Sequence, residues 1–139
     1  MSQTWEINGL SLELDLDDAD VMERYEKAFA VMAEEEKAVP KDGKQSVRIR
    51  AYCKLYHDLY DRIFGEGTSE KIFAGVKTSV QAADEIYVSF LTFVTAQRVQ
   101  SAKERAEWRA KYMPNRKQRR TASKAVKKAV KKAVNGSEK

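Results

Sequence analysis

The feature that most limits the possible folds is a long stretch, residues 78–111, that contains neither glycine nor proline. Its apolar residues recur at the three- and four-residue steps of a helix, at Val80, Ala83, Tyr87, Phe90, Leu91 and Val94. The β-branched run at residues 88–95 would also suit a strand. Because its flanks are helical and no turn residue bounds it, the pattern favours one long helix. Charged residues dominate after Gln97, where Trp108 and Tyr112 remain as apolar anchors.

Three more helices are predicted before this stretch. Asp17 and Asp18 can cap the first, which Pro40 and Gly43 close; its apolar stripe is Val21, Tyr25, Ala28, Phe29 and Met32. The second helix begins at Ser46, ends before Gly65, and is apolar on more than one side. The third is short, beginning at Thr68 and ending at Gly75, with Ile72 and Phe73 as its apolar residues.

The N-terminus predicts a β-hairpin instead. Asn8 and Gly9 both accept a positive φ, which a type I′ turn requires. The following leucines alternate with polar residues and so share one sheet face: Leu10, Leu12, Leu14 and Leu16. Since an isolated hairpin is marginally stable in water, this face must cover a helix or pair with another chain. The sequence therefore predicts a mainly α-helical domain with an N-terminal hairpin over residues 1–112, followed by a basic tail over residues 113–139.

Charge is distributed unevenly along the chain. Residues 1–40 carry 11 acidic and 3 basic side chains, whereas residues 100–139 carry 3 acidic and 14 basic ones, within a formal net charge of +5. The tail contains three Ala-Val units, two of them followed by Lys-Lys, and this four-residue repeat gives a helix a thin apolar seam and a broad lysine face. Because like charges repel, we expect the tail to be disordered alone and helical on a surface.

Few residues suggest catalysis or metal binding. Cys53 and His57 lie one helical turn apart, but without an oxyanion hole or orienting group they are interpreted as packing residues. The acidic group at residues 15–20 lacks the glycine and the closing glutamate of a calcium loop and is better explained by capping and solvation. We predict no enzyme activity, cofactor or metal. No membrane is expected as a partner, because no apolar run approaches the ~18 residues of a span, and the polar start is neither a signal nor a transit peptide.

Several apolar residues are candidates for binding another polypeptide. The recurrence of Tyr52, Tyr56 and Tyr60 at every fourth residue indicates core or interface side chains rather than a platform for nucleic-acid bases. The candidate partner-binding residues are Leu12, Leu14, Tyr52, Tyr56 and Phe90. The sequence does not separate this role from a role in the core. Edge-to-edge pairing of the leucine strand would also build a homo-oligomer.

The basic tail has three interpretations beyond a purely solubilising role. It could bind nucleic acid by counterion release, contact an anionic membrane weakly, or dock on an acidic protein surface. The candidate contact residues are Arg116, Lys117, Arg119, Arg120, Lys127, Lys128, Lys131 and Lys132.

Two stretches carry a resemblance to a known class of proteins. The first comprises Ile7-Asn8-Gly9, Leu12-Glu13-Leu14-Asp15, Asp18-Ala19-Asp20 and Tyr25-Glu26-Lys27-Ala28; the second is the P-N-R-x-Q-R-R ending within Tyr112-Met113-Pro114-Asn115-Arg116-Lys117-Gln118-Arg119-Arg120. Together they resemble phage tail assembly chaperones, the small, mostly helical proteins made beside the tape-measure protein. The Ala-Val-Lys-Lys repeats lie beyond that pattern.

The resemblance implies a non-enzymatic chaperone that binds the tape-measure protein in the host cytoplasm. A client that exposes apolar helical seams would need apolar grooves on its chaperone and charge that keeps the complex dissolved. The alternatives are a nucleic-acid-binding protein that acts through the basic tail and a structural subunit of the tail or virion.

Overall fold

A computed structural model describes residues 3–113 and 127–131 of the 139-residue chain. In the first of these ranges, two strands precede four helices: β1 (Thr4–Ile7), β2 (Leu10–Glu13), α1 (Ala19–Glu36), α2 (Gln45–Phe64), α3 (Thr68–Ile72) and α4 (Val80–Tyr112). The predicted mainly α-helical fold with an N-terminal hairpin is confirmed. The run at residues 88–95 is helical, as its flanks indicated.

By its internal contacts the chain divides into two units, residues 1–99 and 100–139. The described part of the first unit, residues 3–99, is called the packed body below. It contains the hairpin, α1, α2, α3 and the first part of α4. The division therefore falls within α4. The domain boundary at residue 112 stays a prediction.

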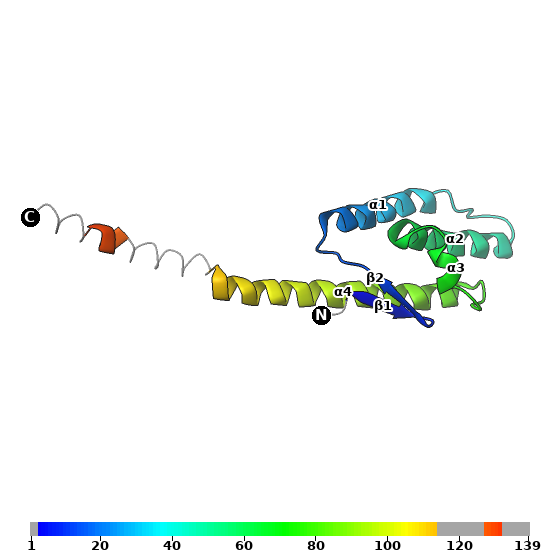
Figure 1. Ribbon diagram of the computed structural model, residues 1–139. Coiled ribbons are helices and arrows are strands. Elements are labelled where there is room, and N and C mark those ends of the chain that lie inside the picture. Colours follow the sequence, from blue (N-terminus) through cyan, green and yellow to red (C-terminus); the bar gives the residue numbers. More distant parts are fainter. Residues whose placement is uncertain (1–2, 114–126, 132–139) are drawn as a thin grey trace, which may run out of the picture. The chain divides into compact units, whose positions relative to one another are not determined.

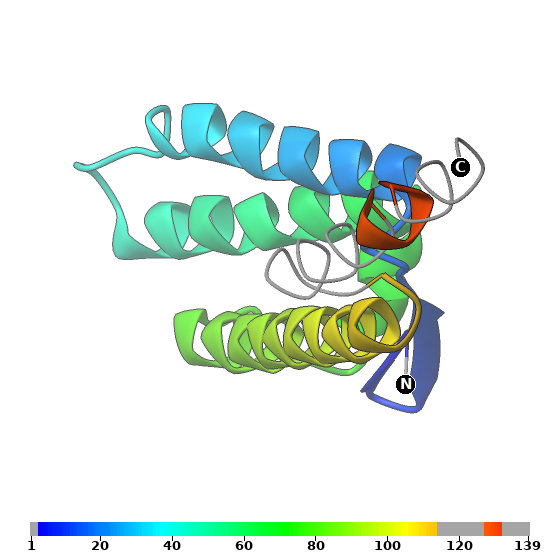
Figure 2. The same ribbon diagram turned by 90° about the vertical axis from the view of Figure 1, so that its left-hand side faces the viewer.

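Helices α1 and α2 run antiparallel, and the first part of α4 packs beside them (Figures 1 and 2). Asp18 is the N-cap of α1, as predicted, and its carboxylate accepts from the backbone N–H groups of Asp20 and Val21. At the C-terminal end of α2, the Arg24 Nε atom donates to the carbonyl of Ile63 at 2.8 Å. Side chains thus satisfy backbone groups that helix ends leave unpaired.

The hairpin pairs Trp5 with Leu12 and Ile7 with Leu10, and its turn residues Asn8 and Gly9 have the positive φ angles that the sequence predicted. The inner face of the hairpin covers α4 (Figure 1). Trp5 is only 2% exposed, and its indole Nε1 donates to the Ser89 hydroxyl on α4 at 3.1 Å. Of the two options for the leucine face, covering a helix is the one observed.

The core of the packed body is rich in aromatic rings. Phe90 is fully buried and lies within 5.1–6.3 Å, between ring centroids, of four rings from three other elements: Trp5, Tyr25, Tyr60 and Phe64. Rings at these separations and tilts pack favourably beyond the area that they bury. Phe90 therefore joins the hairpin, α1 and α2 to α4.

A buried glutamine connects the segment after the hairpin to α4. Gln97 is 3% exposed; its Oε1 accepts from the backbone N–H of Leu16 at 2.9 Å, and its Nε2 donates to the carbonyl of Leu14 at 2.7 Å. The strand ends at Glu13, and the N–H of Leu14 makes a last bond across the hairpin, to the carbonyl of Gln3 at 2.7 Å, so the Leu14 carbonyl and the Leu16 N–H are left to bond elsewhere. Gln97 supplies the missing hydrogen bonds and allows both leucines to be buried.

Candidate protein-binding surface

The five candidate partner-binding residues fall into two groups. Leu14, Tyr56 and Phe90 are buried in the core, which accounts for their apolar spacing. Leu12 and Tyr52 are half-buried and pack against that core. A role for any of the five in binding a partner stays a prediction, and only Leu12 and Tyr52 offer substantial surface to one without rearrangement.

Tyr52 and Tyr56 lie one turn apart on α2 and share a carboxylate of α4. The Tyr52 hydroxyl donates to Asp84 Oδ1 at 2.7 Å, the Tyr56 hydroxyl approaches the same oxygen at 3.4 Å, and the two hydroxyl oxygens are 2.9 Å apart. Burial, more than any neighbouring charge, raises the pKa of both phenols. Both groups therefore remain protonated near neutral pH and act as donors that tie α2 to the start of α4.

A groove opens beside Tyr52, where the connection between α1 and α2 meets the start of α4. Its volume is about 320 Å³, and a smaller depression of about 200 Å³ shares Val39, Pro40 and Leu55 with it. We call the two together the hinge groove. Its apolar lining is Val39, Pro40, Ile49, Tyr52, Leu55 and Val80, and the rim of the larger part carries Glu36, Lys41 and Arg48. An apolar floor with charges of both signs at the rim suits an amphipathic peptide.

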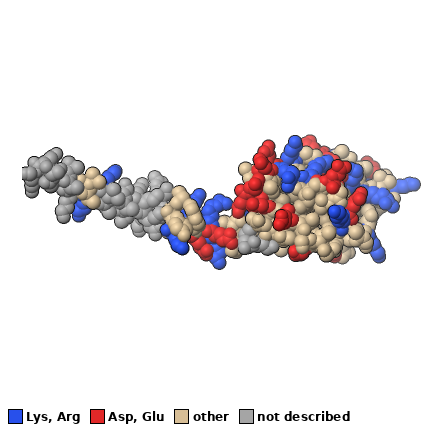
Figure 3. Space-filling view, in the orientation of Figure 1, with Lys and Arg blue, Asp and Glu red and all other residues tan. Residues whose placement is uncertain are grey.

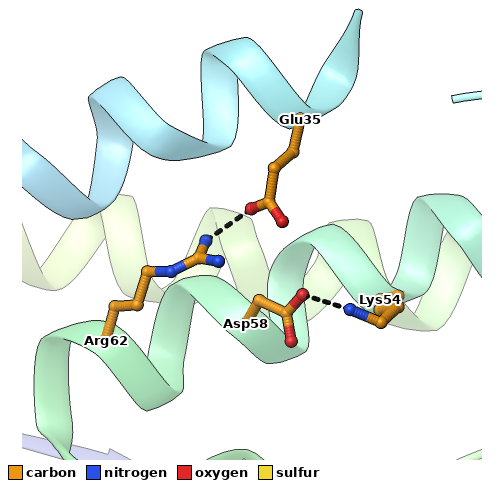
Figure 4. Close-up of polar contacts among 4 residues, drawn as sticks. All are labelled: Glu35, Lys54, Asp58 and Arg62. Carbon is orange, nitrogen blue, oxygen red and sulfur yellow. Dashed lines mark hydrogen bonds and ion pairs between the residues drawn. The ribbon is translucent and has the colours of Figure 1, made fainter. Parts of the chain in front are cut away.

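Two ion pairs hold the helices that border the hinge groove (Figure 4). Arg62 of α2 reaches Glu35 of α1 at 2.5 Å, and both side chains are about one-third exposed. Lys54 and Asp58 pair at 2.6 Å along α2, where the lysine is largely exposed. Pairs this close to solvent contribute little to stability. We assign the Arg62–Glu35 pair to fixing the alignment of α1 on α2, whereas the Lys54–Asp58 pair joins successive turns of α2.

The exposed surface of the packed body differs between its elements. On the face drawn in Figure 3, acidic and basic side chains are interspersed over α1 and α2, and uncharged side chains are more frequent over the hairpin and α4. Along α4, Val88 is 61% exposed and Val99 is 64% exposed. Residues 86–97 of this helix contain no charged side chain. The outer side of α4 is therefore a second apolar surface. A hollow of about 580 Å³, lined by Val80, Gln81, Asp84, Glu85 and Val88, shares Val80 with the hinge groove and Val88 with this surface.

Cys53 and His57 are packing residues, as interpreted from the sequence. The Cys53 thiol is buried and donates to the carbonyl of Ser79 at 3.5 Å, and burial raises its pKa. The His57 ring stacks on Phe73 with 4.1 Å between centroids, and burial lowers its pKa. A thiol with a raised pKa has little thiolate at neutral pH, so this arrangement does not prepare a nucleophile.

The acidic group near residue 18 caps the backbone. Asp15 Oδ1 accepts from the N–H of Asp17 at 3.0 Å, in addition to the contacts of the Asp18 cap. Within residues 3–113 and 127–131, no group of three or more potential metal-ligating side chains is arranged to hold an ion. In the same ranges, no helix combines the length and the hydropathy needed to cross a membrane.

Part of the basic tail lies within the described residues. Residues 127–131 are helical and exposed, and they include three of the predicted contact residues, Lys127, Lys128 and Lys131. Val130 in the same turn is 57% exposed. The other predicted contact residues lie outside the described ranges: Arg116, Lys117, Arg119, Arg120 and Lys132.

Sequence reasoning missed Gln97, the hinge groove and the outer side of α4. Gln97 marked only the end of an apolar pattern. Nothing in a single sequence shows that its amide will bond the backbone of Leu14 and Leu16, which lie more than 80 residues earlier. The hinge groove combines residues from three elements and has no local pattern. For α4, the absence of charge on either face of residues 86–97 was a usable signal.

The fold and these surfaces define a small helical protein with a closed aromatic core and two exposed apolar surfaces. The chain belongs to a family of unknown function (DUF6673), whose sequence pattern matches residues 8–123. No curated protein and no solved structure matches the chain. The matched range contains the hinge groove and the whole of α4 and ends before the Ala-Val-Lys-Lys repeats.

Proposed function

We propose that this protein is a non-enzymatic tail assembly chaperone that binds the tape-measure protein of a phage in the host cytoplasm. The hinge groove is the observation that carries the proposal. Its floor is apolar and its rim bears both charges, which is the combination that receives one face of an amphipathic helix. The resemblance of residues 7–28 and 112–120 to tail assembly chaperones supports the choice of client.

The closed core is consistent with this role. The most conspicuous polar cluster of the packed body, formed by Tyr52, Tyr56 and Asp84, joins α2 to α4, since both phenols donate to the same carboxylate oxygen.

Coexpression with the tape-measure protein tests the proposal. We expect the wild-type chain to keep the client in the soluble fraction and to be recovered with it. Val39→Lys places a charge in the floor of the hinge groove and should reduce recovery by about tenfold, the effect of burying an uncompensated charge. Val47→Lys is the matched control, because Val47 is 51% exposed on α2 and does not line the groove.

Two results would contradict the proposal. If the wild-type chain contacted no tape-measure protein, that protein would be ruled out as its client. Recovery of the protein as a component of finished particles would instead identify a structural subunit, because an assembly factor leaves before the particle is complete.

A nucleic-acid-binding function is the second candidate. It is favoured by the exposed lysines of residues 127–131 and by the excess of basic over acidic side chains after residue 100. Titration of duplex DNA at two salt concentrations distinguishes it from a protein-docking tail. Tight binding that collapses with salt and disappears on truncation at Pro114 would support the nucleic-acid function.

A further inference from the structure

We infer that the outer side of α4 is a self-association surface, on which a second copy of the chain pairs its own α4 in the antiparallel direction. The surface consists of Val88, Thr92, Thr95 and Val99, all within the packed body, and is called the α4 stripe. This inference does not depend on the proposed client.

The spacing of the α4 stripe is that of paired helices. Its members follow one another by four, three and four residues, which keeps them on one side of a helix facing a partner helix. All four are exposed. The Thr92 hydroxyl already donates to the carbonyl of Val88 at 2.8 Å, so covering this threonine would leave no unpaired donor. The stripe thus offers two exposed valines and a threonine whose donor is already used.

The order of residues in the α4 stripe is self-complementary. Read in either direction it is Val, Thr, Thr, Val with the same spacing. A two-fold axis through the middle of the stripe would place Val88 of one copy opposite Val99 of the other, and Thr92 opposite Thr95. An interface between identical copies around a two-fold axis requires this reciprocity.

Charge along α4 selects the antiparallel direction. Within the packed body, the charged side chains of α4 are Asp84 and Glu85 near its start and Arg98 beside the last residue of the stripe. Antiparallel copies bring Arg98 of each helix to the end of the stripe that carries Glu85 of the other, which is attractive. Parallel copies would place Asp84 and Glu85 beside their own equivalents, which is repulsive. Opposed helix dipoles favour the same direction.

The oligomeric state of the full chain tests the inference directly. Sedimentation velocity over a range of concentrations should show a monomer–dimer equilibrium, weakened as salt screens the charges. Val88→Glu should raise the dimer dissociation constant by about tenfold or more, because it buries a carboxylate without a partner. Val47→Glu, an exposed valine on α2, should leave the constant unchanged. Circular dichroism on each variant establishes that it is folded.

Disulfide trapping tests the direction of pairing and does not rely on a destabilising variant. With an added mild oxidant to accept the two electrons, a mixture of full-length Val88→Cys and Val99→Cys chains should form the mixed disulfide at least about tenfold faster than either chain alone forms its own, because only the mixed pair of thiols lies opposite each other in the antiparallel dimer. The wild-type chain is the control, since its single Cys53 is buried.

Three results would overturn the inference. These are a monomer at every concentration, a dimer that Val88→Glu and Val47→Glu affect equally, or Val88→Cys disulfides that form faster within one variant than in the mixture. Loss of client binding by Val88→Glu in a chain that stays monomeric would assign the α4 stripe to a client instead.

Discussion

The two sides of α4 within the packed body have similar chemistry and opposite surroundings. The inner side contributes Ala83, Ile86, Phe90, Val94 and Gln97, all buried, whereas the outer side carries the exposed α4 stripe. Neither side has a charge between residues 86 and 97. The two sides differ in their largest side chain, because the inner side carries the ring of Phe90 and the outer side has valine and threonine. The comparison teaches that hydrophobicity alone does not decide which side of a helix is covered.

Phe90→Ala should produce the largest difference between the two sides of α4. Removing a fully buried ring that touches four others should lower the free energy of unfolding by about 3–5 kcal/mol. In the monomer, Val88→Ala on the outer side should change it by less than about 0.5 kcal/mol. Urea unfolding followed by circular dichroism measures both changes. Equal losses in the free energy of unfolding would show that the two sides of α4 do not differ in their contribution to stability.

Gln97→Leu should have the next largest effect. The leucine fits the apolar surroundings but leaves the N–H of Leu16 and the carbonyl of Leu14 without their partner, at a cost of about 2–3 kcal/mol. Gln81→Leu is the exposed control on the same helix. If the two substitutions proved equally mild, Gln97 would not be the tether that holds the segment after the hairpin.

Ser89→Ala lies between the two sides and should lower the free energy of unfolding by about 1 kcal/mol, because it removes the partner of the indole N–H of the buried Trp5. Ser46→Ala, at an exposed position on α2, is the matched control. A double-mutant cycle with Trp5→Phe sharpens the measurement: the two costs should overlap, since both remove the same hydrogen bond. Fully additive costs would show that the hairpin does not depend on this bond.

The smallest effect at neutral pH concerns Tyr56, which contacts Asp84 of α4. Its folded pKa is raised above the unfolded value of 10.0, so its contribution to stability is complete below that pH and is lost as pH rises above it. Tyr56→Phe should make the alkaline decrease of the free energy of unfolding shallower, and Tyr112→Phe, at an exposed position, should not. Urea unfolding between neutral pH and about pH 11 compares them; identical slopes would contradict this assignment.

Much of the fold could be predicted because its signals are local. Asn8 and Gly9 specify their turn through φ angles that few other residues adopt, and Asp18 caps α1 with its own carboxylate. The candidate binding surface was harder to predict from the sequence. Leu14, Tyr56 and Phe90 carry the same apolar signal whether they bind a partner or fill the core, and the signal does not report what covers them.

The amino-acid sequence by itself determined the order and type of the helices, the hairpin, the capped start of α1 and the change in charge along α4, because each depends on residues a few positions apart. The tertiary structure alone decided that Phe90 joins the hairpin to two other helices, that Gln97 serves the backbone of Leu14–Leu16, and that three elements enclose the hinge groove. These features depend on contacts between segments that are distant in the sequence. Such contacts leave no periodic pattern along the chain from which they could be predicted.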